Sequence, residues 1–210
     1  MNVTQSKDTP EQIETNETLG VDLGVVQLAT DSTGESFSGA KVHEVRTRYQ
    51  KRRSELQRVD TRSAKRRLKQ LSGREKRFQK DTNHGIAKTL VQKAVISRKA
   101  LALEDLTDII RERTTIRREI RYERHSWAFF HLRMYSAYKA AWASIPIKFV
   151  DSRNTSRTCS ACGHCEKANR ESQASVRCKQ CGFCCNADYI AALKISRVPV
   201  NVPLVAPVRE

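Results

Sequence analysis

Two Cys-X-X-Cys pairs offer the clearest chemistry in this sequence. Fifteen residues separate the pairs, which are Cys159/Cys162 and Cys178/Cys181. Four thiolates delivered as two short-range pairs suit tetrahedral Zn²⁺, because each pair can sit on a tight turn and present two sulfurs from one side. A glycine directly follows each pair, as such a turn favours. The spacing therefore predicts a structural zinc site in a zinc ribbon.

The total of seven cysteines leaves a second interpretation to weigh. Two disulfides in a secreted domain would use the same four residues. The odd total and the lack of a signal peptide at the start of the sequence favour a reducing compartment instead. We therefore expect a cytoplasmic protein in which the three remaining cysteines are not zinc ligands: Cys165, Cys184 and Cys185.

Three carboxylates stand where the sequence predicts the centre or the end of a secondary-structure element. Asp22 lies inside an apolar run, Glu104 ends a second apolar run, and Asp188 opens the helix after the second Cys pair. Burying an unpaired carboxylate costs several kcal/mol, so a buried Asp22 needs a partner. Taken singly, the three acids also fit a turn, a strand end at the surface and the first turn of a helix.

One sheet can bring the three acids together. Clustered carboxylates bind Mg²⁺ or Mn²⁺, and two such ions can activate water and stabilise the leaving oxygen of a phosphodiester. We therefore interpret Asp22, Glu104 and Asp188 as candidate catalytic residues. Asp105 and Asp151 lie at or near the ends of the strands predicted over 100–106 and 147–151, and we expect them to cap these elements or to support the site without binding the metal.

The charge of the chain indicates a polyanionic partner. Formal net charge is +16, and aromatic residues make up only 6% of the sequence, which favours nucleic acid. A membrane is disfavoured because no apolar stretch approaches the roughly 20 residues of a transmembrane helix. Residues 41 to 80 hold sixteen Lys or Arg against four acids. A solvated helical face is the simpler alternative, but we expect nucleic-acid contacts from two clusters: Lys51, Arg52, Arg53, and Lys65, Arg66, Arg67.

The pattern of apolar residues predicts an α/β protein with a mixed sheet. We expect strands over 19–30, 35–40, 100–106 and 147–151, with a turn at 31–34. Residues 41–80 predict a basic helix or helical hairpin interrupted near Ser72 and Gly73, and a cap signal at 81–83 predicts a new helix over 86–98. We expect a charged, mobile stretch over 111–124, followed by a helix. One stripe of this helix predicts core packing, with base stacking as the alternative: Trp127, Phe130, Met134, Tyr138 and Ala141.

The sequence resembles the TnpB family of transposon-encoded, RNA-guided DNA endonucleases. The segments that carry the resemblance are GVDLGVVQLA, LALEDLTDI, HSWAFFHLR, FVDSRNTSRTCSACG and RCKQCGFCCNADYIAALKI, spread over residues 19 to 196. The resemblance implies a RuvC-like, ribonuclease H-type fold with the zinc ribbon inserted before the last catalytic helix. On that pattern Asp22, Glu104 and Asp188 match the three catalytic acids, and the two Cys pairs match the zinc ligands.

The resemblance also implies a domain organisation. We expect a disordered segment 1–17, a nuclease domain over 18–154 and 186–197 with a basic helical insertion at 41–81, a zinc ribbon at 155–185 and a tail at 198–210. Family members carry an N-terminal barrel and helical lobe that hold the guide RNA, whereas about eighteen residues precede the first strand here. We therefore expect an N-terminally truncated copy, completed by a separately encoded half if it is complemented at all.

Two functions follow as hypotheses. The first is a Mg²⁺- or Mn²⁺-dependent DNA endonuclease related to transposition, in which the three acids hold the metal. The second is a non-catalytic remnant or regulator that binds nucleic acid through the basic helices and the ribbon.

Overall fold

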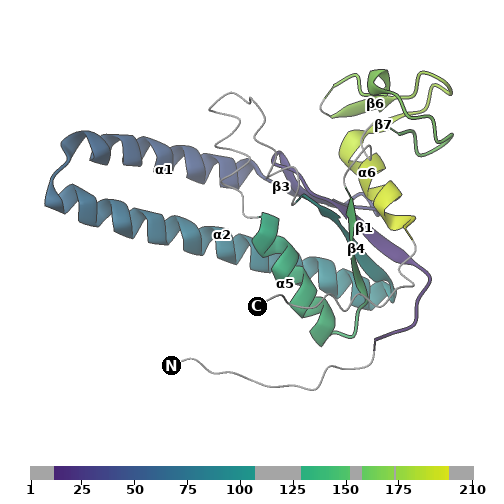
Figure 1. The fold of residues 1–210 in the computed structure, drawn as a ribbon, viewed down its shortest axis with the longest axis horizontal. Helices are drawn as coiled ribbons and strands as arrows, with labels where there is room; N and C mark the ends of the chain where they lie inside the picture. Colours follow the sequence, from purple (N-terminus) through teal and green to yellow (C-terminus); the bar gives the residue numbers. More distant parts are fainter. Residues whose placement is uncertain (1–11, 107–128, 152–157, 173, 199–210) are drawn as a thin grey trace.

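A five-stranded mixed sheet forms the centre of the protein (Figure 1). The computed structural model describes residues 12–106, 129–151, 158–172 and 174–198. The strand order is β3-β2-β1-β4-β5, with β1 parallel to β4 and β4 parallel to β5, and with β1, β2 and β3 joined as an antiparallel meander. The expected mixed α/β sheet is confirmed. The strands are β1 (Thr18–Asp22), β2 (Gln27–Asp31), β3 (Ser36–Ser38), β4 (Ala100–Asp105) and β5 (Ile147–Asp151).

The apolar run predicted as one strand over 19–30 is a hairpin of two strands, β1 and β2. Gly24 permits the tight return, because a Cβ at this position would lie 2.7 Å from the carbonyl oxygen of Gln27. Asp22 is consequently the last residue of β1 and not the middle of a longer strand. The predicted turn at 31–34 is confirmed: the Asp31 carboxylate accepts from the N–H groups of Thr33 at 2.8 Å and Glu35 at 3.1 Å.

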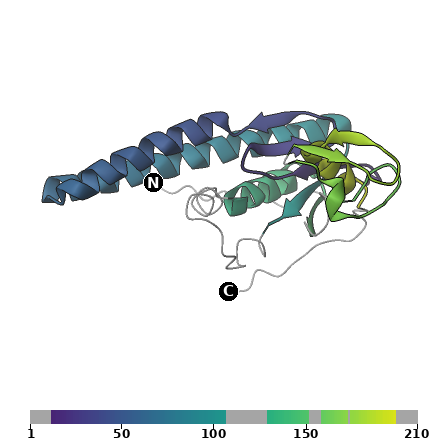
Figure 2. The same cartoon turned by 90° about the horizontal axis from the view of Figure 1, so that it is seen from above.

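Two long helices, α1 (Ala40–Val59) and α2 (Arg62–Ser97), form a hairpin that projects from the sheet (Figures 1 and 2). The hairpin turns at Asp60, whose φ of 47° is left-handed, and Thr61 caps α2 by accepting from the N–H of Ala64 at 3.2 Å. The predicted interruption near Gly73 and the predicted cap at 81–83 are therefore wrong. One glycine costs a helix only about 1 kcal/mol, too little to end it without a competing cap.

Helices cover both faces of the sheet. The second half of α2 and α5 (Phe129–Trp142) pack on one face, where Leu19, Val21, Leu101 and Leu103 join the main core. Alternate residues of a strand point to opposite faces, so Gly20 faces the other side, which α6 (Ala187–Ser196) covers. A Cβ on Gly20 would lie 2.2 Å from the carbonyl oxygen of Ala192. The glycine thus lets the α6 backbone lie directly against β1, which places the start of α6 near the end of β1.

Of the predicted stripe on α5, Tyr138 packs against the main core as expected, but Phe130 and Met134 do not. Phe130 is 67% exposed and Met134 is 43% exposed, while Trp127 lies outside the described residues. The buried face instead carries Leu132, Tyr135, Ser136 and Ala140, which recur at helical spacing on the neighbouring stripe. Base stacking by the exposed stripe stays a prediction.

Several expected segments lie partly or wholly outside the described residues. The mobile stretch at 111–124 and the tail from residue 199 onward are among them. The N-terminal segment is described from residue 12, where the N–H of Ile13 donates to the carbonyl of Ser144 at 2.9 Å and Glu17 forms an ion pair with Lys99 at 2.8 Å. Within the described ranges, no helix is long and apolar enough to cross a membrane.

Candidate metal centres and nucleic-acid interface

The two Cys pairs occupy two turns of matching geometry. In each turn the glycine after the second cysteine has a positive φ, 78° for Gly163 and 72° for Gly182. The N–H of each glycine donates to the carbonyl of the first cysteine of its pair, at 3.1 and 3.0 Å. Backbone N–H groups also donate to the sulfurs of Cys159 and Cys178, at 3.4 and 3.5 Å. Short-range sequence features are therefore sufficient to aim two sulfurs from each turn in one direction.

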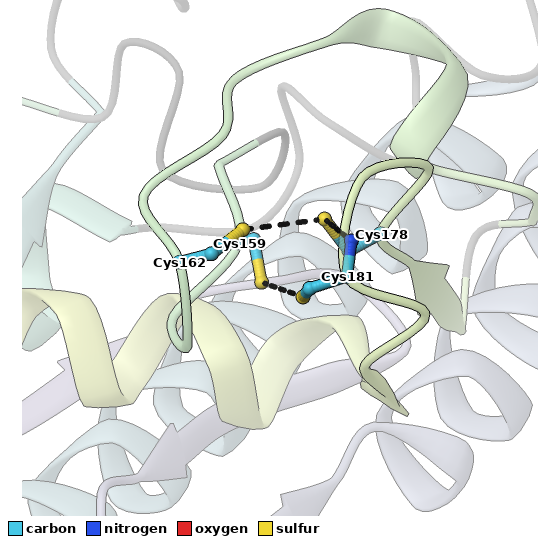
Figure 3. A group of neighbouring side chains, drawn as sticks. All are labelled: Cys159, Cys162, Cys178 and Cys181. Carbon is cyan, nitrogen blue, oxygen red and sulfur yellow. Dashed lines mark hydrogen bonds between the residues drawn. The ribbon is translucent and has the colours of Figure 1, made fainter.

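The four sulfurs meet in one cluster (Figure 3). All four lie within 4.8 Å of one another, and the contacts between the turns are 3.7 Å for Cys159 to Cys181 and 3.5 Å for Cys162 to Cys178. A tetrahedral zinc site with Zn–S bonds of about 2.3 Å has sulfurs about 3.8 Å apart. The donor set and its spacing thus fit structural Zn²⁺, and the predicted cluster is confirmed.

The thiol pKa values show why this cluster needs a cation. The backbone N–H of Cys181 helps to lower the pKa of Cys178 to about 7. At Cys181 the backbone N–H of Phe183 acts in the same sense, but burial and the neighbouring thiols outweigh it and raise the pKa to about 12. Four adjacent sulfurs cannot all ionise while they repel one another, and a bound dication removes that conflict.

Asn169 joins the two cysteine turns and was not identified from the sequence. Its side chain is fully buried; the Nδ2 group donates to the carbonyl of His164 at 3.1 Å, and Oδ1 accepts from the N–H of Lys179 at 2.9 Å. It is the last residue of the short helix η1 (Lys167–Asn169), which precedes the two ribbon strands β6 (Ser175–Arg177) and β7 (Cys184–Asn186). An isolated Asn in a polar loop carries no local signal for this role.

The three predicted acids converge at one end of the sheet from β1, β4 and α6. Asp22 ends β1, and Glu104 stands one residue before the end of the neighbouring parallel strand β4. Asp188 lies in the first turn of α6, where Asn186 caps the helix by accepting from the N–H groups of Asp188 and Tyr189, at 2.9 and 3.2 Å. The Glu104 carboxylate also accepts from the N–H of Leu23 at 3.4 Å. Among the described residues, the three carboxylates are less tightly grouped than the four thiols.

The pKa values of the three acids reflect their mutual approach. Burial raises the pKa of Asp22 well above its usual range, and the charges of Glu104 and Asp188 raise it further. Burial likewise raises the pKa of Glu104 to about 7, although the N–H of Leu23 opposes it, and burial raises the pKa of Asp188. Oxygen ligands crowded into a partly buried space, with negative charge in excess, fit a hard dication such as Mg²⁺ or Mn²⁺.

This crowding predicts a pH dependence of stability. The pKa of Glu104 rises from 4.5 to about 7 on folding, so the folded chain binds the Glu104 proton more tightly than the unfolded chain does. This proton therefore stabilises the fold fully below pH 4.5, and the stabilisation is lost as the pH rises through 7. Without added Mg²⁺ and with zinc bound, the free energy of unfolding in urea should fall between pH 4.5 and 8 by on the order of 3 kcal/mol more for the wild type than for Glu104→Gln. Equal pH profiles for the two proteins would contradict the crowding.

Arg170 brings positive charge from the ribbon to the acids, and sequence reasoning missed it. Its guanidinium lowers the pKa of both Asp22 and Asp188 against the effect of burial. The Arg170 backbone bridges to Val176 in β6, which places Arg170 on the ribbon side of the site. Asp105 and Asp151, by contrast, stand opposite each other at the ends of β4 and β5, and Asp105 pairs with Arg133 at 2.8 Å.

The basic hairpin carries the six predicted nucleic-acid contacts, which are not equivalent. Arg53 is committed to a half-buried ion pair with Glu75, and Lys65 pairs with Asp60 at 3.0 Å. A second basic face on α2 has no acidic partner among the described residues. It surrounds Gly73 and borders an open groove of about 490 Å³, lined by Arg66, Lys69, Gln70, Gly73, Arg74 and Arg77. Lys69, Arg74 and Arg77 therefore join Arg66 as candidate phosphate contacts.

Comparison with known proteins places this architecture in a class. A solved structure of a "Cas12f1-sgRNA-target DNA complex" superposes with a TM-score of 0.68 at 22% identity, covering 85% of this chain and 49% of that one. This likeness concerns the fold. The mixed sheet with its helices and four-Cys cluster is thus a RuvC-like fold with a four-Cys module suited to zinc, as expected.

Family models then identify the chain more closely. The family described as "Probable transposase" matches residues 2–107, and the "Cas12f1-like, TNB domain" matches residues 129–195. The chain therefore belongs to the probable transposase family, and its second half matches the TNB domain of the Cas12f1-like proteins. The predicted TnpB-type membership is confirmed.

Two curated relatives are RNA-guided or CRISPR-associated nucleases by name. "CRISPR-associated endodeoxyribonuclease Cas12f1" of Sulfoacidibacillus thermotolerans is 29% identical over 202 residues, which is 88% of this chain and 46% of the relative. "Putative RNA-guided DNA endonuclease InsQ" of Escherichia coli is 28% identical over 199 residues, which is 84% of this chain and 48% of the relative. The chain spans about half the length of these relatives.

Proposed function

We propose that this chain is the nuclease part of a transposon-associated, metal-dependent DNA endonuclease. The observation that carries the proposal is the convergence of Asp22, Glu104 and Asp188 from three separate elements, close enough for their charges to affect one another. A bound pair of Mg²⁺ or Mn²⁺ ions would supply an activated water and stabilise the leaving oxygen of a phosphodiester. The match of the chain to endodeoxyribonucleases supports the same reaction class.

Each residue of the proposed site has its own task. The three carboxylates hold the metals, and the Leu23 N–H orients one oxygen of Glu104. Arg170 lies on the ribbon side, where its guanidinium is positioned to offset the charge of a phosphate. The zinc module holds Arg170 and the start of α6 beside the sheet, so its role is structural.

DNA is the proposed substrate, and a guide RNA is the proposed second ligand, as the names of the relatives suggest. The relatives' remaining length corresponds to a barrel and helical lobe in the proposed organisation, supplied by the same or by a separate chain. The domain bounds given above and a cytoplasmic location are part of the same proposal.

The test is cleavage of labelled single-stranded DNA by the purified protein, alone and with a family N-terminal half plus guide RNA. Mg²⁺ or Mn²⁺ should support cleavage and Ca²⁺ should not. No cleavage under either condition would favour the second candidate, a non-catalytic nucleic-acid binder. The unpaired basic face of α2 is the observation that favours that candidate.

Binding should depend on the face around Gly73 more than on the paired cations. Each phosphate neutralised by a Lys or Arg contributes about 0.9 to the slope of log affinity against log salt. Replacing Arg66, Lys69, Arg74 and Arg77 by alanine should therefore flatten the slope by up to about 3.6 in fluorescence anisotropy titrations between 50 and 200 mM salt. Replacing the ion-paired Arg53 and Lys65 should change it less; the reverse order would show that we chose the wrong face.

A further inference from the structure

A polar groove opens beside the proposed metal site and shares Asp188 with it. It has a volume of about 360 Å³ and lies over β2, β3 and the first turn of α6. That volume is in the range of small-ligand sites. The residues that matter for its chemistry are Gln27, Thr30, Ser36, Asn186, Asp188 and Tyr189.

Strand register connects this groove to the carboxylates. Thr30 stands directly opposite Asp22 in the antiparallel pair of β1 and β2, and Ser36 stands opposite Thr30 in the pair of β2 and β3. Directly opposed residues share one face of a sheet. Ser36, Thr30 and Asp22 therefore form a row across three strands, which runs from the sheet edge to the proposed metal site.

Two buried polar atoms along the groove lack a partner in the described part of the chain. They are the Thr30 hydroxyl, in a residue only 5% exposed, and Oε1 of Gln27. Buried polar atoms in native proteins are almost always hydrogen-bonded, so an unsatisfied pair that lines a cavity indicates a ligand. The register shift between Gln27 and Ala29 is the kind of irregularity that redirects a side chain toward a site.

One wall of the groove is formed by the aromatic ring of Tyr189. Tyr189 follows Asp188 in α6, and its Cε2 atom would lie 3.8 Å from a Cβ built on Gly34, in the turn between β2 and β3. The ring is only partly buried and lines the same cavity as the two unsatisfied atoms. The groove thus combines a π-face with hydrogen-bonding groups on its floor, which is the combination that holds a nucleotide.

We propose that this groove is a nucleotide subsite, which holds the sugar and base of the nucleotide next to the phosphodiester at the carboxylates. The proposal rests on the proposed function, because it takes the row from Ser36 to Asp22 as the path of the substrate strand. The base stacks on Tyr189, while Thr30 and Gln27 bond the sugar or the base edge. Tyr189 and Thr30 are thus positioning residues for the strand.

Photo-crosslinking and binding together test the subsite. A five-nucleotide thymidine strand that carries 5-iododeoxyuridine should crosslink to Tyr189 on irradiation, as peptide mass spectrometry would show. Tyr189→Leu should weaken binding of this strand about tenfold, and Thr30→Val about fivefold, whereas Tyr189→Phe should keep most of the affinity. Thr89→Val, an exposed threonine on α2, is the matched control and should bind as the wild type does.

The outcomes separate this proposal from the proposed function. Metal-dependent cleavage with crosslinks only on the α1–α2 hairpin, or with unchanged affinity in Tyr189→Leu, overturns the subsite and leaves the nuclease standing. A Tyr189 crosslink without cleavage supports the subsite and contradicts the proposed nuclease activity. If Thr30→Val fails to fold, as judged by its zinc content and circular dichroism, the two Tyr189 variants and the crosslink decide alone.

Discussion

Alanine at Asp22, Glu104 or Asp188 should abolish metal-dependent cleavage, and each single change should cost nearly as much as all three together. Residues that hold one metal centre act as a unit, so their losses do not add. The measurement is the initial rate of cleavage of single-stranded DNA, under the condition, protein alone or with an N-terminal half and guide RNA, in which the wild type is active. Binding of DNA should persist in all three variants, because the cations of α2 lie on a separate element.

Asp105 and Asp151 supply matched controls for this series. Both are strand-end acids close to the site, but Asp105 is held by Arg133, and Asp151 is exposed. Asp105→Ala and Asp151→Ala should therefore lower the rate much less. Full activity in Asp22→Ala would remove Asp22 from the site, and an equal loss in all five variants would indicate general damage to the sheet.

The sequence pointed to groups that the structure brings together where the signal is local or where an apolar strand carries an acid. The four clustered cysteines were identifiable because each pair and its glycine form a complete turn within five residues. Asp22 and Glu104 stood out because a carboxylate in an apolar strand is costly to bury, and Asp188 because it opens a helix after the Cys motif. The strand pairing that brings β1 beside β4 is what joins them.

Sequence reasoning failed where the deciding contact is long-range or where two local signals compete. Arg170 approaches the acids only because the ribbon packs on α6, through Val176, Ala187 and Ile190. The hairpin turn lies at Asp60 and not at Gly73, because Thr61 offers a cap and Gly73 merely lowers helix propensity. Thr30 became informative only once its register opposite Asp22 was known.

Loss of zinc should reach the proposed metal site through a short covalent path. The second Cys pair leads into β7, which ends at Asn186, the residue that caps α6 at Asp188 and Tyr189. The far end of α6 is tied to the first Cys turn, where Arg197 donates to the carbonyl of Ser160 at 2.7 Å. Both ends of α6 therefore depend on the folded ribbon.

Cys159→Ser or Cys178→Ser should reduce bound zinc from about one per chain to nearly none, because a four-thiolate site contributes roughly 10 kcal/mol or more of apparent binding energy. With little apolar core of its own, the ribbon should then unfold, and amide hydrogen exchange at Asp188 and Tyr189 should accelerate strongly while that of β4 stays slow. Elemental analysis and exchange mass spectrometry measure the two effects.

Cys165→Ser and Cys184→Ser are the controls and should keep both the zinc and the slow exchange in α6, since neither sulfur belongs to the cluster. Stoichiometric zinc in both ligand variants would show that other groups hold the metal, and zinc loss without faster exchange in α6 would show that the helix stands on its contacts with β1 alone.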